Sequence, residues 1–202
     1  MTNKIGILVA MDQEIPPSTL KELGLQHIAI IGVGKVNASI GAMQLLHAQP
    51  QLEILINVGT AGAVHKTVGE VLRCSNFIQR DFELPFPELA HYNQPISFQS
   101  SLSNKYPHLT NHHHTCSTGD NFVHLDTHHA QIAHPFDCLE MEAYAIAKVC
   151  QLQQKQFLAL KYISDNSDNA SKDDWAESLQ GKAKSALSEE LKNLLISLRA
   201  QS

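Results

Sequence analysis

The stretch IAIIGVGKVNASIGAMQLLH, residues 28–47, sets the class of fold. Its first part, Ile28–Gly32, is a short apolar run of the kind that forms a buried strand. Its second part, Lys35–His47, follows a glycine turn and carries apolar residues at the spacing of one helix face. The residues on that face are Val36, Ile40, Met43 and Leu46. A strand, a turn and a helix in this order predict one unit of an α/β protein.

The same alternation continues along the chain. Further buried strands are predicted at Ile5–Ala10, Ile54–Val58 and Phe157–Ile163. Further helices are predicted at Gln13–Leu23, Glu142–Gln151 and Trp175–Leu198. This order of elements predicts an α/β layer fold with a largely parallel sheet. Residues 82–114 show no sustained period and indicate a long loop with short strands, a kind of segment that is often functional.

Composition limits the class of protein. The 202 residues are 43% hydrophobic and 17% charged, which fits one globular domain over residues 1–202, or two at most. A net charge of −5 gives no support to binding of nucleic acid or an anionic membrane. The N-terminus indicates a first strand rather than a signal peptide, and no apolar segment is long enough to span a membrane. The four cysteines form no CxxC pair, so we expect buried free thiols and a cytoplasmic protein.

Polar residues follow several of the predicted strands. In parallel sheets, ligands bind at the carboxyl ends of the strands, so these residues are candidates for a site. They are Met11–Glu14, Gly32–Lys35, Gly59–Gly62 and Ser164–Asp165. The segment STGDNFV, residues 117–123, joins them as a further candidate.

A carboxylate stands out in DCLEMEAYAIAKVC, residues 137–150. At about 100° per residue, Glu142 projects between Ile146 and Val149 on the apolar face of the predicted helix, whereas Glu140 falls on the other side. Burying an unpaired carboxylate is costly or raises its pKa. Glu142 is therefore paired structurally, lies at a misplaced helix boundary, or acts on a ligand.

Three shorter motifs each allow two interpretations. GVGKVNAS (32–39) and INVGTAGAV (56–64) are glycine turns after strands, suited to a polar ligand but equally consistent with plain turns. GVGKVNAS matches neither the dinucleotide-binding motif nor the P-loop motif. In KYISDNSDNA (161–170), Lys161, Ile163 and Asp165 share a strand face, with Asp165 at the carboxyl end, although the segment also fits an Asx turn.

The histidines give a weak metal signal. His112, His113 and His114 are consecutive, and adjacent residues of one element point in different directions. His128 and His129 form no HxxxH pair with them. We interpret the region as an exposed loop and expect neither a metal nor a cofactor.

Taken together, the motifs resemble the nucleoside phosphorylase/hydrolase superfamily, and most closely the bacterial 5′-methylthioadenosine/S-adenosylhomocysteine nucleosidases. GILVAMDQEI, GVGKVNAS, INVGTAGAV, STGDNFV, LEMEAYAIAKVC and KYISDNSDNA occur in the order of that family. The resemblance implies a three-layer α/β/α sandwich with a central twisted mixed sheet. It also implies a homodimer that cleaves the N-glycosidic bond of a small-molecule purine nucleoside.

The resemblance implies a role for each carboxylate. Glu14 is the base that activates water, Glu142 holds the ribose hydroxyls, and Asp165 acts as an acid at purine N7. Departure of the base requires a proton at N7, so Asp165 is expected to be protonated while Glu14 and Glu142 are ionised.

Other positions are implied to bind the substrate. Phe122 stacks on the base, the backbone of Val123 reads its edge, and Met141 packs against the sugar. The remaining implied contacts are Met11, Val33, Thr60, Ala61, Gly62, Glu140, Lys161 and Ser164.

The chain departs from the family pattern in a few places. It is short between Leu20 and Ile31, where the family has further strands, and Lys161 replaces an arginine. Asn57 stands where related phosphorylases place a phosphate-gripping arginine, which favours water as the nucleophile. The alternatives are a nucleosidase for another 5′ group (futalosine type), a purine nucleoside phosphorylase, or a non-catalytic nucleoside-binding homologue.

Overall fold

The computed structural model describes residues 2–63, 66–82, 86–107, 113–123, 135–167, 171–178 and 181–199. Its strands are β1 (Ile5–Val9), β2 (His27–Ile30), β3 (Ile54–Gly62), β4 (Val71–Gln79), β5 (Ile96–Ser97), β6 (His114–Thr118), β7 (Cys138–Glu140) and β8 (Gln156–Asp165). Its α-helices are α1 (Pro17–Glu22), α2 (Lys35–Ala48), α3 (Gln99–Lys105), α5 (Ala143–Leu152), α6 (Ser171–Ser178) and α7 (Lys182–Arg199). Short 3-10 helices are η1 (Thr2–Lys4) and η2 (Pro87–Asn93).

The strands form one mixed sheet in the order β2-β1-β3-β7-β6-β4-β5, and β8 pairs with both β3 and β4. The pairs β1–β2, β1–β3, β3–β8, β4–β6 and β6–β7 are parallel. The pairs β3–β7, β4–β8 and β4–β5 are antiparallel, so the largely parallel sheet predicted from the alternation is corrected to a mixed one. The pairings also close a ring of strands, β3-β8-β4-β6-β7.

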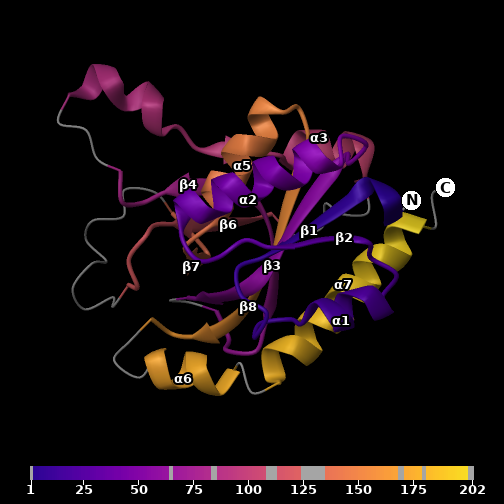
Figure 1. The fold of residues 1–202 in the computed structure, drawn as a ribbon. Coiled ribbons are helices and arrows are strands. Elements are labelled where there is room, and N and C mark those ends of the chain that lie inside the picture. Colours follow the sequence, from indigo (N-terminus) through magenta and orange to yellow (C-terminus); the bar gives the residue numbers. More distant parts are fainter. Residues whose placement is uncertain are drawn as a thin grey trace.

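Helices cover the sheet on two sides, as in an α/β/α sandwich (Figure 1). On one side, α2 packs against α5, and on the other, α7 packs against β3, β4 and β8. Apolar side chains from strands and helices form one continuous core, including Ile7, Leu55, Leu160, Ile146 and Leu191. In the described part of the chain, no helix is long and apolar enough to cross a membrane.

Helix α2 begins and ends close to its predicted bounds, but its apolar stripe faces outward. Val36, Ile40 and Met43 are 70%, 52% and 39% exposed. The helix packs instead through Ala38, Ala42 and Leu46, because small side chains let it approach the neighbouring elements closely. Leu46, the fourth residue of the predicted stripe, is therefore on the packed side, and the prediction of one common apolar face is corrected: only Val36, Ile40 and Met43 lie on the uncovered side.

Three other predicted elements differ from the structure. The helix predicted at Gln13–Leu23 is shortened to α1, whose start is set by Pro16 at its N-cap and Pro17 at its first position. The helix predicted at Trp175–Leu198 is two helices, and Gly181, with a positive φ of 130°, immediately precedes the second. The segment 82–114 contains η2, β5 and α3, so it is more structured than a loop with short strands.

The histidine region lies partly outside the described residues. This holds for His112, His128 and His129. His114 begins β6, and its Nδ1 lies 3.3 Å from a carboxylate oxygen of Asp137, so it belongs to the sheet rather than to an exposed loop.

Candidate active site

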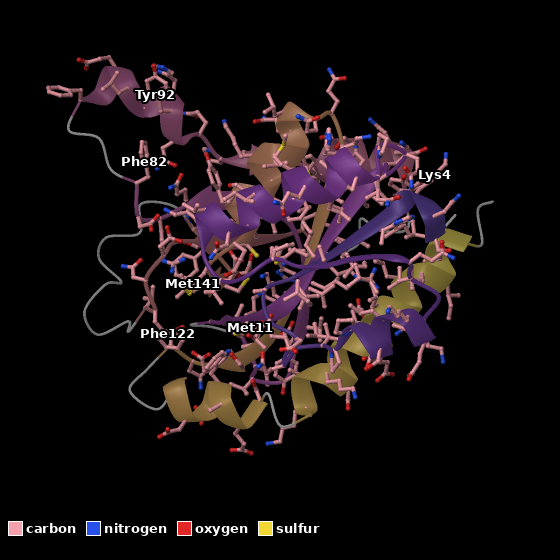
Figure 2. The ribbon with its side chains drawn as sticks, viewed as in Figure 1. Lys4, Met11, Phe82, Tyr92, Phe122 and Met141 are labelled. Carbon is pink, nitrogen blue, oxygen red and sulfur yellow. The ribbon has the colours of Figure 1, made fainter. Side chains whose placement is uncertain are left out.

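A cavity opens where β1, β3 and β8 end. Its position follows from the sheet register, in which Gly62 of β3 lies opposite Asp165 of β8. Figure 2 shows Met11, Phe122 and Met141 gathered on the same side of the molecule. The lining consists of Ala10, Met11, Glu14, Val33, Thr60, Ala61, Gly62, Arg80, Asn121, Phe122, Val123, Leu139, Glu140, Met141, Glu142, Ser164, Asp165, Ser167 and Trp175. Every residue to which the resemblance assigns a role lines this cavity, except Lys161.

Glu14 is held by the strand end opposite it. Its Oε1 accepts hydrogen bonds from the Thr60 backbone N–H at 2.7 Å and the Thr60 hydroxyl at 2.8 Å, and its Oε2 accepts the Met11 N–H at 3.3 Å. Burial raises the pKa of Glu14 and outweighs the opposing charge of Lys161 and these hydrogen bonds. Gly59 makes room for this carboxylate, because a Cβ there would lie 2.8 Å from Oε1. Glu14 is thus a buried, oriented carboxylate with increased basicity.

Asp165 lies at the end of β8 and is fixed on both oxygens. Its Oδ2 accepts a hydrogen bond from the Ser164 hydroxyl at 2.7 Å, and its Oδ1 accepts the Ser167 N–H at 2.9 Å. Gly62 again provides the space, because a Cβ there would lie 2.8 Å from Oδ1 of Asp165. The two glycines of the INVGTAGAV motif therefore accommodate carboxylates, a role that the sequence pattern alone does not specify.

Glu142 stands at the N-cap position of α5 and is buried. Its Oε1 accepts the backbone N–H of Gly34 at 2.9 Å, which links the glycine turn before α2 to this carboxylate. Burial and the neighbouring Glu140 carboxylate raise the pKa of Glu142 to about 7. Without a ligand, Glu142 is therefore partly protonated near neutral pH, rather than fully ionised as expected from the sequence.

Glu140 is buried as well, contrary to the expectation that it lies on the opposite side from Glu142. It belongs to β7, and its carboxylate accepts the backbone N–H groups of Glu142 at 2.9 Å and Ala143 at 2.8 Å at the start of α5, and the Thr118 hydroxyl. Burial acts to raise its pKa, but Lys161 and these hydrogen bonds together lower it. Glu140 is thus an ionised anchor for the segment that carries Glu142.

Lys161 lies behind the cavity and does not line it. Its Nζ is 2.9 Å from Oε2 of Glu140, and the Lys161 side chain is 2% exposed. Burial opposes its charge, but Glu140 and Glu142 raise the pKa of Lys161. This geometry corrects the expectation of a substrate contact: the ammonium is used inside the protein, where it balances the buried carboxylates.

Arg80 is a lining residue that the sequence analysis did not identify. Its guanidinium donates to the carbonyls of Ser117, Gly119, Asn121 and Glu140, at distances between 2.5 and 3.2 Å. It thereby joins the end of β6 to β7 and to the segment before Phe122. Arg80 directly follows β4, so a correct prediction of that strand would have placed it among the candidates.

The other lining residues, to which no individual role was assigned, are Ala10, Asn121, Leu139, Ser167 and Trp175. Asn121 lies in the candidate segment 117–123, Leu139 and Ser167 lie in quoted motifs, and Trp175 is expected from the sequence only as the start of a helix. The indole N–H of Trp175 donates to the Thr60 hydroxyl at 3.1 Å, and that hydroxyl donates to Glu14. Helix α6 therefore contacts the candidate base through one intermediate hydroxyl.

These contacts bring several carboxylates together in one candidate site. Three carboxylates, Glu14, Glu142 and Asp165, line one cavity and have different hydrogen-bond partners. Carboxylates that differ in environment can divide the roles of base, acid and charge stabiliser. Fold and site together define a mixed α/β protein with a carboxylate-lined cavity at the carboxyl edge of the sheet, where parallel-sheet proteins commonly bind ligands.

The chain belongs to the phosphorylase superfamily, because the family model of that description matches residues 19–198. A curated relative from Staphylococcus epidermidis, named 5′-methylthioadenosine/S-adenosylhomocysteine nucleosidase, is 25% identical and covers 80% of this chain and 86% of its own. A relative of the same name from Exiguobacterium sp. is 27% identical, with 86% and 91% covered.

Solved structures share the fold. A Streptococcus pneumoniae MTA/SAH nucleosidase in complex with 8-aminoadenine has a TM-score of 0.78 at 22% identity, covering 95% of this chain and 98% of that one. The futalosine hydrolase of Helicobacter pylori has a TM-score of 0.73 at 21% identity, with 95% and 97% covered. The three-layer architecture implied by the resemblance is confirmed.

Proposed function

We propose that this protein is a hydrolase that cleaves the N-glycosidic bond of a 5′-modified adenosine of the methylthioadenosine/S-adenosylhomocysteine type, releasing adenine. The observation that carries the proposal is the convergence of Glu14, Glu142 and Asp165 on one cavity. The names of the curated relatives support the same reaction and substrate class.

In this proposal, Glu14 is the base and acts at the sugar. Glu14 takes a proton from the attacking water, and the Thr60 N–H and hydroxyl keep its carboxylate in one orientation. The pKa of Glu14, raised by burial, makes it a stronger base than a solvated glutamate.

In this proposal, Asp165 is the acid. A Cβ at Gly59 would meet Glu14 and a Cβ at Gly62 would meet Asp165, so the two carboxylates approach β3 at different positions along the strand. Asp165 donates a proton or a strong hydrogen bond to purine N7, so that adenine leaves as a neutral base.

Glu142 is neither the base nor the acid in this proposal, and its role is to bind the sugar. Its carboxylate accepts hydrogen bonds from the ribose hydroxyls and stabilises the positive charge that develops on the sugar ring. Met141 packs against the sugar, and Phe122, which is 41% exposed, stacks on the base at the cavity rim.

Water rather than phosphate is the nucleophile. Asn57 is buried and its amide donates to the Leu8 carbonyl at 3.1 Å, away from the cavity lining. Within the described residues, Lys161 behind the cavity is paired with Glu140, and the two terminal nitrogens of the lining Arg80 donate to backbone carbonyls, while its Nε has no partner. A phosphate that bound these terminal nitrogens or Lys161 would displace existing contacts.

The active form is a homodimer in the cytoplasm. The exposed stripe of Val36, Ile40 and Met43 on α2 is an apolar surface suited to a second copy of the chain. All four cysteines are free and buried, which fits a reducing compartment.

A second candidate is hydrolysis of a nucleoside with another 5′ group. The fold similarity to a futalosine hydrolase favours keeping this alternative, because the residues around the ribose do not specify the 5′ substituent.

The experiment is a substrate panel in phosphate-free buffer. We would incubate the purified protein with 5′-methylthioadenosine, S-adenosylhomocysteine, futalosine, adenosine and inosine, and separate the products by chromatography. We expect free adenine from the first two, together with 5-methylthioribose and S-ribosylhomocysteine respectively. A strict requirement for phosphate with ribose 1-phosphate as product would establish a phosphorylase instead. Tight binding without any base release would establish a non-catalytic binder.

A further inference from the structure

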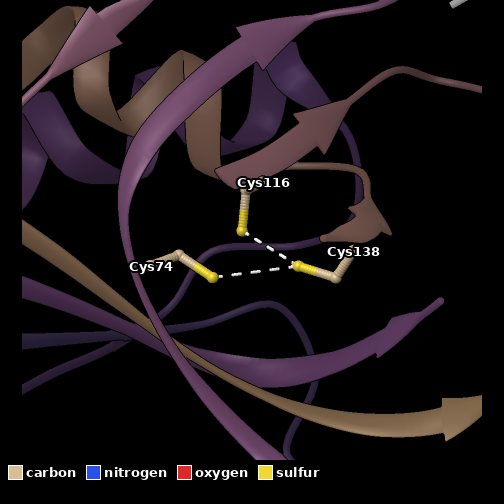
Figure 3. A group of neighbouring side chains, drawn as sticks. All are labelled: Cys74, Cys116 and Cys138. Atoms are coloured by element: carbon tan, nitrogen blue, oxygen red, sulfur yellow. Dashed lines mark hydrogen bonds between the residues drawn. The ribbon is translucent and has the colours of Figure 1, made fainter. Parts of the chain in front are cut away.

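Three buried cysteines from separate strands bring their sulfur atoms together (Figure 3). Cys74 belongs to β4, Cys116 to β6 and Cys138 to β7, and none of the three side chains is exposed to solvent. The Sγ of Cys138 lies 3.4 Å from that of Cys116 and 3.8 Å from that of Cys74, and all three sulfurs lie within 4.8 Å of one another. We call these residues the thiol cluster.

The sheet holds the thiol cluster rigidly. Cys116 and Cys138 are register partners in the parallel pair of β6 and β7, and β4 pairs along the other edge of β6. Positions two residues apart on a strand face the same side, so Cys116 shares its side with Thr118, and Cys138 with Glu140. The cluster therefore lies one step along the strands from the Thr118–Glu140 contact beneath the candidate active site.

The spacing fits coordination of a metal ion. A thiolate–zinc bond is about 2.3 Å long, and two such ligands at a tetrahedral angle lie about 3.8 Å apart. The measured separations of 3.4 and 3.8 Å approach that value without backbone movement. Hard ions such as Mg²⁺ and Ca²⁺ require oxygen ligands, whereas thiolates select soft ions such as Cu⁺ and Zn²⁺.

Two other interpretations account for less of the geometry. Free cysteine often packs as a small apolar side chain, but packing alone does not require three sulfurs from three strands to converge. A disulfide requires an S–S distance of about 2.05 Å and a two-electron oxidant, whereas the sulfurs here lie 3.4 and 3.8 Å apart and a disulfide would leave the third thiol unused.

We propose that Cys74, Cys116 and Cys138 form a binding site for one soft, thiophilic metal ion coordinated by three thiolates. Binding releases the three thiol protons to solvent and transfers no electrons, so no oxidant or reductant is needed. The proposal is independent of the nucleosidase reaction, because none of the three cysteines lines the candidate active site.

The test uses the reduced, metal-free full chain and Cd²⁺ as the probe, with Zn²⁺ and Cu⁺ in parallel. We expect one ion per chain by native mass spectrometry in the presence of a competing chelator, with a thiolate-to-metal charge-transfer band in the ultraviolet. Binding to the folded state should also raise Tm with increasing metal concentration. Loading is carried out both on the folded protein and during refolding, because the cluster is buried.

Variants locate the bound ion. Cys74→Ser, Cys116→Ser and Cys138→Ser should each weaken binding by more than about 100-fold, since loss of a mere supporting partner already costs about 10–100-fold. Cys150→Ser is the matched control, because Cys150 is equally buried but lies on α5 outside the thiol cluster. Unchanged affinity in Cys138→Ser, or an equal loss in Cys150→Ser, would overturn the proposal.

A measurement on the unaltered chain covers the case in which a variant does not fold. X-ray absorption at the bound metal should show a shell of three sulfur atoms. The chain has 12 histidines, so ions could also bind to imidazoles. A shell of nitrogen or oxygen without sulfur would reject the thiol cluster as the site, as would the absence of stoichiometric uptake.

Discussion

The ammonium of Lys161 and the carboxylate of Glu140 form a fully buried ion pair, with Nζ 2.9 Å from Oε2. The pair joins β8 to β7 directly beneath the candidate active site. Removing one partner of a buried pair leaves an uncompensated charge, which typically costs about 3–5 kcal/mol.

We therefore predict that Lys161→Met lowers the free energy of unfolding by about 3–5 kcal/mol in urea denaturation. Lys148→Met, at an exposed position of α5, is the control and should have little effect. The double variant Lys161→Met/Glu140→Gln should recover part of the loss, because both charges are then absent. A loss below about 1 kcal/mol for Lys161→Met would show that the pair has no such role.

The second prediction concerns the pH dependence of stability through Glu142. Its pKa is raised by burial to about 7 from its usual value of 4.5, so the folded state binds this proton more tightly than the unfolded state. The resulting stabilisation is complete below about pH 4.5 and is lost as the pH rises through 7, and it amounts to about 3 kcal/mol. Glu142→Gln should thus be more stable than the parent at pH 8, and by a smaller margin at pH 5, in denaturant titrations at each pH.

The same variant tests the role of Glu142 in the reaction. Glu142→Gln should lower kcat/KM, and the disadvantage of a 2′-deoxy substrate should shrink. A variant that changes only the stability profile and keeps the parental kinetics would assign Glu142 a structural role.

The third prediction concerns Asp165 as the general acid. Asp165→Asn should reduce the rate of adenine release by at least about 10²–10⁴-fold, the usual contribution of such an acid. It should spare 4-nitrophenyl riboside, whose leaving group departs without a proton. Asp12→Asn, an exposed carboxylate on the loop that carries Glu14, serves as the control. Adenine release by Asp165→Asn at a near-parental rate would remove the acid from the mechanism.

The fourth prediction uses the close approach of Gly59 to Glu14. In Gly59→Ala, the new Cβ would lie 2.8 Å from Oε1, so the carboxylate must move. A displacement of about 1 Å can cost roughly 100-fold in rate, and we expect a loss of that order in kcat with the fold retained by circular dichroism. In a Glu14→Gln background, Gly59→Ala should add little, because the two changes act on one group. Additive losses would mean that Gly59 acts elsewhere.

The fifth prediction concerns the exposed stripe of α2. Ile40→Glu should shift the protein from dimer to monomer in sedimentation velocity, because a charge then lies in the apolar surface. Ile196→Glu on α7 is a matched control, since Ile196 is 54% exposed and Ile40 is 52% exposed. A parent protein that sediments as a monomer, or equal dissociation in both variants, would exclude this interface.

Continuous apolar runs, and their alternation with helical patterns, made much of the fold predictable. Strands β1, β3 and β8 are runs that are buried throughout or nearly so, and such runs are visible in a single sequence. Strand β4 was missed because Arg73, Ser75 and Asn76 interrupt its apolar residues, and β7 is only three residues long.

The direction in which individual side chains point could not be predicted reliably from the sequence, for the site or for helix α2. The sequence places Lys161 on the same strand face as Asp165, but the irregular register between β3 and β8 at Ala61 and Gly62 alters the alignment near the cavity. In α2, both the apolar stripe and the small residues Ala38 and Ala42 are candidates for the packed face. Only the packing of the surrounding elements decides between them.

The hydrogen bond from Trp175 to Thr60 has a practical consequence. Trp175 is the single tryptophan of the chain, so its fluorescence is not mixed with emission from any other indole. Its N–H is bonded to the hydroxyl that holds Glu14, and its ring borders the cavity. A nucleoside bound in the cavity as proposed would change the surroundings of that ring, so the indole would serve as an intrinsic optical probe by which ligand affinity can be titrated without a label.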